Sequence, residues 1–225
     1  MERVKPILFN TEMVRAILDG RKTQTRRVCK GQGECNPVQV GYHPPFKPGD
    51  ILWVRETWHK DAGRYMYRAN YIEDEKFYRN GQEVTLRWHP SIHMPKEAAR
   101  IFLRVKDVRV ERLQNITCAD ITSEGVDDIE PCEGSEMLCN FCPLDDSQKG
   151  VHNYGNGPVM CEGAHCEEAH EAWVENYIDS FADLWDSTIK PSDRDVYGWD
   201  ANPWVWVIEF ERCEKPEGWC GCGEG

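Results

Sequence analysis

Three residues of reactive type could work together in this chain: Lys22, Thr25 and Glu124. Lys22 stands three residues before Thr25, in a segment rich in arginine. Neighbouring cations disfavour a protonated lysine, and a neutral lysine can take the proton of a threonine hydroxyl and make it a nucleophile. A carboxylate such as Glu124 could orient that pair or carry the proton. Spacing alone favours a solvated basic turn and an exposed helix-end glutamate over this chemistry, which stays open as the alternative.

Two helix ends are expected to position these side chains. Residues 11–19 carry apolar residues on one face and stop at Gly20, which leads directly into the basic segment around Lys22. A second, brief helix begins at the capping-box pattern of residues 117–120 and ends at Gly125. This second pattern places Glu124 in the last turn of its helix.

The rest of the chain predicts several short strands and one long helix. Residues 51–58, 64–71, 99–110 and 204–211 read as strands, and Asn80-Gly81 is a hairpin turn signal. From Cys166 to Trp185 an apolar or aromatic residue recurs every four positions, which is typical of an amphipathic helix. We therefore expect an α+β chain built on a small mixed β-barrel with short flanking helices.

Charge is distributed unevenly along the chain. The net charge is −12, yet residues 1–116 carry 22 Lys and Arg against 14 Asp and Glu, a balance of +8. Residues 117–225 carry 5 and 25, a balance of −20. A basic first half could meet phosphates while the acidic half faces elsewhere, although the two charges could also cancel in the folded chain. No signal peptide or membrane span is visible, so a cytoplasmic location is expected.

Four cysteines have the spacing of a structural zinc site. The chain has 11 Cys, and a reducing compartment favours metal ligation over disulfides. We call one set the insertion cysteines: Cys139, Cys142, Cys161 and Cys166. They form a Cys-x2-Cys pair and a Cys-x4-Cys pair that could close a tetrahedron around Zn²⁺. The alternative is a loop with free thiols; Cys132, Cys213, Cys220 and Cys222 have no assigned role.

The segment from Gly20 to Arg26, together with Arg27 after it, resembles the G-x-K-x-x-T-x-R signature of ASCH-domain proteins, which have PUA-like folds. Residues 48–54, 113–125 and 204–210 are similar to later segments of the same domain, so the resemblance covers roughly residues 5–60, 99–126 and 200–212. The whole chain is more similar still to phage and prophage ASCH proteins, some of which carry the label "morphogenetic protein". The family's small enzymes are amidohydrolases that remove the acetyl group of N4-acetylcytidine.

That resemblance implies roles for particular residues. Lys22, Thr25 and Glu124 fall on the positions of the catalytic Lys, Thr and Glu of the small amidohydrolases. A nucleoside or RNA would then lie against aromatic faces and be read by charged side chains. The residues expected to contact it are Arg21, Arg26, Trp53, Arg55, Glu56 and Trp58. Unlike those enzymes, this chain has long loops and a Cys-rich insertion.

The expected organisation has four parts. Residues 1–126 form the first part of the barrel, 127–190 the Cys-rich insertion and its helix, 191–213 the last barrel strand, and 214–225 a flexible tail. Three functions remain open: amide hydrolysis on an acylated nucleoside, recognition of RNA or a modified base without catalysis, and a role in phage assembly.

Overall fold

The structure is a computed structural model that describes residues 3–72, 75–126, 151–154, 157–160 and 164–219. Its strands are Val4–Leu8 (β1), Gln24–Val28 (β2), Ile51–Arg55 (β3), Trp58–Asp61 (β4), Arg64–Tyr67 (β5), Phe77–Arg79 (β6), Gln82–Val84 (β7), Phe102–Arg112 (β8), Val151–Tyr154 (β9), Gly157–Met160 (β10) and Trp204–Cys213 (β11). Its α-helices are Thr11–Leu18 (α1), Cys118–Ser123 (α2), Ala164–Thr188 (α3) and Arg194–Tyr197 (α4). Short 3-10 turns cover Arg68–Asn70 (η1), Ser91–His93 (η2), Lys96–Ala98 (η3), Leu113–Asn115 (η4) and Pro191–Asp193 (η5).

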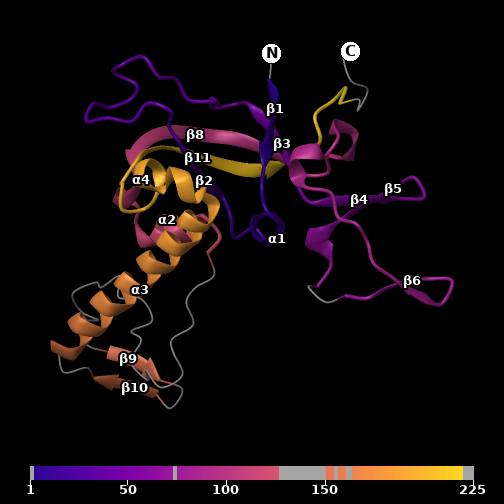
Figure 1. Ribbon diagram of the computed structural model, residues 1–225. Coiled ribbons are helices and arrows are strands. Elements are labelled where there is room, and N and C mark those ends of the chain that lie inside the picture. Colours follow the sequence, from indigo (N-terminus) through magenta and orange to yellow (C-terminus); the bar gives the residue numbers. More distant parts are fainter. Residues whose placement is uncertain (1–2, 73–74, 127–150, 155–156, 161–163, 220–225) are drawn as a thin grey trace.

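The body of the molecule is a five-stranded mixed sheet in the order β1-β3-β8-β11-β2. Strands β1 and β3 are parallel, and the other neighbours are antiparallel. The α+β class is confirmed, with few helices around one main sheet (Figure 1). The long strands β8 and β11 pair along their whole lengths, with a register shift between Glu209 and Phe210. These two strands form the centre on which both halves of the chain meet.

The closed barrel expected from the sequence is wrong for the described residues, because β1 and β2 remain the two edges of an open sheet. Side chains, and not a backbone ladder, join these edges. The Arg27 guanidinium on β2 donates to the Leu8 carbonyl on β1 (2.8 Å) and lies 5.2 Å from the centre of the Phe9 ring. The space between the edge strands is therefore occupied by an aromatic ring and a cation.

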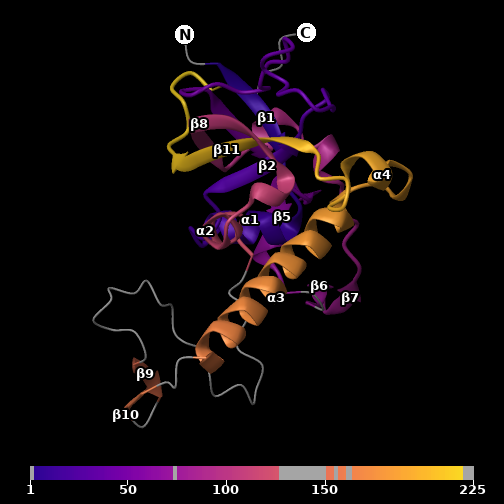
Figure 2. The ribbon, with the colours of Figure 1, turned by 90° about the vertical axis from the view of Figure 1, so that its left-hand side faces the viewer.

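The two short helices form where the sequence predicts them. Asn10 caps α1 by accepting from the Met13 amide (2.8 Å), and Val14 and Ile17 bury the apolar face of the helix. The capping box of α2 is confirmed, with Thr117 and Asp120 exchanging both of its hydrogen bonds. Both helices lie on the same side of the sheet in both views (Figures 1 and 2).

The described residues between 57 and 99 form an arm between β3 and β8, which we call the aromatic arm. The predicted strand over residues 51–58 divides here: β3 ends at Arg55, and β4 starts a separate hairpin with β5. The hairpin predicted at Asn80-Gly81 is present as β6–β7. Figure 1 shows these hairpins projecting away from the main sheet on the right.

A buried ion pair closes the base of the aromatic arm. Glu56, just before the arm, is 1% exposed and accepts two hydrogen bonds of 2.8 Å from the guanidinium of Arg100, just after it. The arm also contacts α1, because Arg15 donates to the carbonyls of Ala69 (3.3 Å) and Tyr71 (2.6 Å). The helix that leads to Lys22 is thus anchored to the arm.

The predicted amphipathic helix is confirmed as α3, which packs its C-terminal half on the sheet (Figure 2). Tyr177, Phe181 and Trp185 are 1%, 3% and 7% exposed, and they share a core cluster with Ile121 of α2 and Val207 of β11. Each such ring contributes about 1.5–3 kcal/mol when fully buried. Of the helices in the described part of the chain, none is long and apolar enough to cross a membrane.

Candidate functional site

Lys22 and Glu124 form a buried ion pair, although 102 positions separate them in the sequence. The Lys22 ammonium, Nζ, is 2.7 Å from Glu124 Oε2 and also 2.7 Å from the Glu124 carbonyl oxygen. Their side chains are 0% and 6% exposed. The turn after α1 aims the lysine, since the Lys22 amide donates to the Ala16 carbonyl (3.0 Å) and the Thr23 amide to the Ser123 carbonyl (2.9 Å).

The environment of Lys22 lowers the pKa of its ammonium group below the ordinary value. Loss of hydration on burial is the largest cause. The Glu124 carboxylate acts in the opposite direction through its charge and hydrogen bond, while Arg27 and Arg26 assist the lowering. Because only the neutral amine can accept a proton, a lowered pKa increases the fraction of the lysine that is able to act as a base.

Arg26 holds the second oxygen of the Glu124 carboxylate. Its Nη1 lies 3.1 Å from Glu124 Oε1, and its Nη2 lies 3.2 Å from Asp120 Oδ2. Arg26 is only 2% exposed, so the expected contact with RNA is not available from this conformation. Glu124 is therefore fixed on both sides, by Lys22 at one oxygen and by Arg26 at the other.

A second layer of charged side chains continues from Asp120 toward solvent. Arg109 donates to Asp120 (3.2 Å), Gln24 (3.3 Å) and the carboxylate of Glu209, and it forms an ion pair with Glu111. Burial alone would raise the pKa of Asp120, but hydrogen bonds from Thr117 and Gln24 and the charge of Arg26 outweigh it and lower that pKa. Asp120 is thus held ionised between two cations.

Thr25 lies on β2 opposite Ile208 of β11 and is 1% exposed. Alternation along β2 puts Gln24 and Arg26 on one face of the strand and Thr25 on the other. Among the contacts of the described residues, no hydrogen bond joins Thr25 to Lys22. The structure therefore brings Lys22 and Glu124 together. Thr25 follows Lys22 by three residues in the sequence and, within the described part of the chain, is not hydrogen-bonded to it.

Phe9 forms the apolar wall of the site. Phe9 is 2% exposed, and the centre of its ring lies 5.8 Å from the Lys22 ammonium. The Arg27 guanidinium contacts the same ring. Burial lowers the pKa of Arg27, and the charge of Glu124 opposes that effect. The sequence analysis missed Phe9, because a phenylalanine after an apolar strand gives no sign of which cations it will meet.

The two helices that carry the site touch at Gly125. This residue has φ +79°, and a Cβ atom placed on it would lie 2.7 Å from Ala16 Cβ and 2.8 Å from Lys22 Cβ. Such contacts are shorter than real Cβ atoms make, so α1 and α2 approach this closely only because residue 125 is a glycine. Arg21, exposed, adds a hydrogen bond of 3.1 Å to the Gly125 carbonyl.

The other residues expected to hold a base lie at the base of the aromatic arm. Trp53 is 8% exposed and packs with Phe102 and Trp219. Arg55 stacks over Trp53 at 5.5 Å and donates to the Ile92 carbonyl, and Trp58 stacks on His89. With Glu56 paired to Arg100, this group makes contacts within the arm and its base, apart from the Lys22–Glu124 pair.

The predicted zinc site lies outside the described residues. Cys139, Cys142 and Cys161 fall in undescribed stretches, and the side chain of Cys166 is not described although α3 includes it. Among the described residues no group of His, Cys, Asp and Glu is arranged to hold a metal ion. The zinc site stays a prediction from spacing.

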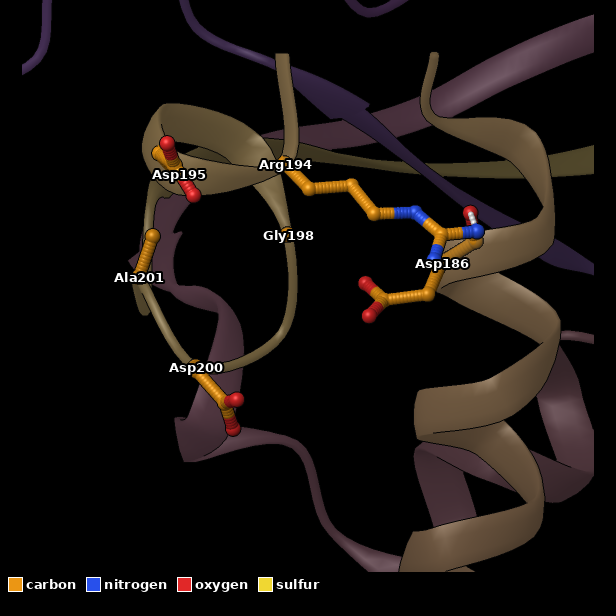
Figure 3. A pocket seen from close by; sticks show the side chains of 6 residues that line it. All are labelled: Asp186, Arg194, Asp195, Gly198, Asp200 and Ala201. Atoms are coloured by element: carbon orange, nitrogen blue, oxygen red, sulfur yellow. Dashed lines mark hydrogen bonds between the residues drawn. The ribbon is translucent and has the colours of Figure 1, made fainter. Parts of the chain in front are cut away.

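An open hollow of about 490 Å³ lies elsewhere, at the end of α3. It is lined by Asp186, Arg194, Asp195, Gly198, Asp200 and Ala201 (Figure 3). Arg194 donates to the Asp186 carbonyl (3.1 Å), and the Asp186 carboxylate accepts a hydrogen bond from the Trp199 amide (2.8 Å). These contacts fix the loop before β11, and the hollow contains none of the predicted site residues.

Comparison of the chain with models of protein families, with curated proteins and with solved structures finds no match.

Proposed function

We propose that the protein hydrolyses an amide bond on an acylated nucleoside, at a site built from Lys22, Thr25 and Glu124. The observation that carries the proposal is the buried Lys22–Glu124 pair, at 2.7 Å and beside the Phe9 ring. A lysine with a lowered pKa, oriented by a fixed carboxylate, suits proton transfer. The nucleoside, the ASCH assignment and its PUA-like fold rest on the resemblance of the Gly20–Arg26 segment.

The proposed reaction has two steps. The neutral Lys22 amine takes the proton of Thr25 Oγ as this oxygen attacks the amide carbonyl carbon. The C–N bond then breaks, and Lys22 returns the proton to the departing nitrogen, which leaves an ester on Thr25. Water attacks that ester, releases the carboxylic acid and restores the threonine hydroxyl. Glu124 keeps the lysine oriented and balances its charge while it is protonated.

The burial and complete pairing of the same side chains favour a second function. Glu124 is paired on both oxygens, and Thr25 is 1% exposed. An ion pair so completely satisfied is also what a structural network requires. In that case the protein would recognise RNA or a modified base without catalysis, and its exposed basic residues would meet the phosphates.

A substrate panel separates the two functions. The protein is incubated with N4-acetylcytidine, with other N-acylated nucleosides and with cytidine itself, and the products are separated by chromatography. Hydrolysis predicts free nucleoside and one equivalent of carboxylic acid. If every acylated nucleoside survives while a single-stranded RNA binds with an affinity that falls steeply with salt, then recognition without catalysis is the function.

A further inference from the structure

Helix α2 is too short to hold Glu124 by itself. It has six residues, and isolated helices of this length are unstable in water, so outside contacts must fix its position. Three consecutive residues supply such contacts, to the main sheet and to α3: Asp120, Ile121 and Thr122. Asp120 faces the arginines of the sheet, and Ile121, which is 0% exposed, enters the core cluster with α3.

The third contact comes from the long helix that follows the insertion. The Tyr177 hydroxyl lies 2.8 Å from Thr122 Oγ1, and Tyr177 is 1% exposed. Thr122 is two residues before Glu124, and its carbonyl accepts the Gly125 amide (2.9 Å). A shift at Thr122 would therefore move the turn that carries both the carboxylate and the carbonyl to which Lys22 is bonded.

From these contacts we propose that Tyr177 is a positioning residue for the site: its hydroxyl locks the last turn of α2 through Thr122, and the long helix α3 thereby sets the place of Glu124 relative to Lys22. The effect on activity rests on the proposed function, whereas the contacts between Tyr177, Thr122 and Glu124 do not depend on it. Tyr177 touches no reacting atom, and its effect passes through Thr122 and Glu124. Helix α3 thus supplies more than apolar packing.

The test replaces Tyr177 by phenylalanine, which removes the hydroxyl and keeps the buried ring. Tyr197→Phe is the matched control, since it makes the same chemical change on α4, away from α2. Thr122→Val removes the partner group, and the double variant completes a cycle that isolates the Tyr177–Thr122 interaction. Urea unfolding of each variant shows whether the fold is intact before any other measurement is interpreted.

The first readout does not depend on any substrate. NMR of protein labelled at the lysine side chains follows the titration of Lys22, and loss of one signal in Lys22→Arg identifies it. Because the Glu124 charge raises the pKa of Lys22, Glu124→Gln must lower the titration midpoint, which gives a reference shift. Tyr177→Phe and Thr122→Val should shift the midpoint in the same direction by a smaller amount, and the double variant should add nothing further.

The second readout is hydrolysis of the acylated nucleoside. A displaced Glu124 should lower kcat roughly threefold to tenfold in Tyr177→Phe, with KM unchanged, while Tyr197→Phe keeps the wild-type rate. A Lys22 midpoint in Tyr177→Phe that equals the wild-type value, or rises toward that of a free lysine, would overturn the inference. A wild-type protein that hydrolyses nothing refutes the proposed reaction, whereas the NMR midpoints still decide the positioning role.

Discussion

Replacing Gly125 by alanine tests the close approach of α1 and α2. The new methyl group would lie 2.7 Å from Ala16 Cβ and 2.8 Å from Lys22 Cβ, and neither atom can move without its backbone. The residue also has φ +79°, a conformation that costs a residue other than glycine roughly 1–2 kcal/mol. Overpacking of a tight contact adds about 1–3 kcal/mol. The unfolding free energy should therefore fall by about 2–5 kcal/mol.

Gly20→Ala is the matched control for this substitution. Gly20 has φ +80°, so alanine there is strained to the same degree, but a Cβ at Gly20 would meet no atom within 4 Å. The unfolding free energy of the control should fall only by the cost of the left-handed conformation. The difference between the two variants then measures the helix–helix contact alone.

Urea unfolding followed by circular dichroism gives both free energies, provided that the slope against urea stays constant. We expect Gly125→Ala to be less stable than Gly20→Ala by about 1–3 kcal/mol. Equal losses in the two variants would refute the reasoning, because they would show that nothing stands close to residue 125 in the folded protein.

Three further predictions concern the charged side chains and the metal. Asp120→Asn should destabilise the protein by about 1–3 kcal/mol at neutral pH. Because the folded-state pKa of Asp120 lies below its ordinary value, the difference from wild type should shrink in acid, as the pH falls through the folded-state pKa; a difference that stays constant in acid would contradict this. Glu56→Gln should lower the unfolding free energy by about 3 kcal/mol, because it leaves Arg100 without its charge partner. The double variant Glu56→Met with Arg100→Met should lose less stability in urea unfolding, and an equal or larger loss would contradict the ion-pair argument. Elemental analysis of protein purified without chelator should find one zinc held by the insertion cysteines, and Cys142→Ser should release it; less than half an equivalent in the wild type would refute the site.

Local patterns in the sequence were sufficient to predict the pieces of the site. The capping box at Thr117 and the glycine stop at Gly125 fix both ends of α2, and they place Glu124 at its last turn. Hairpin chemistry at Asn80-Gly81 and the four-residue aromatic period of α3 were equally local, and both are present. Such signals succeed because they depend on residues one or two turns apart.

What failed depended on partners far away in the chain. Arg26 reads as part of a solvated basic turn, yet it is buried because Asp120 and Glu124, nearly 100 positions later, neutralise it. Strand β2 was missed for the same reason, since its charged residues hide a strand whose partner is β11. Closure of a barrel depends on backbone bonds between edge strands, which no local pattern reports.

The most direct test of the account compares wild-type protein with Lys22→Met and Thr25→Val on N4-acetylcytidine. Methionine and valine keep the size of the buried side chains and remove the amine and the hydroxyl. Circular dichroism checks that each variant is folded. We expect cytidine and acetate in equal amounts from the wild type, and a rate at least 100-fold lower from each variant, which corresponds to the loss of roughly 2.7 kcal/mol or more of transition-state stabilisation. No cytidine from the wild type, or an undiminished rate from either variant, would contradict it.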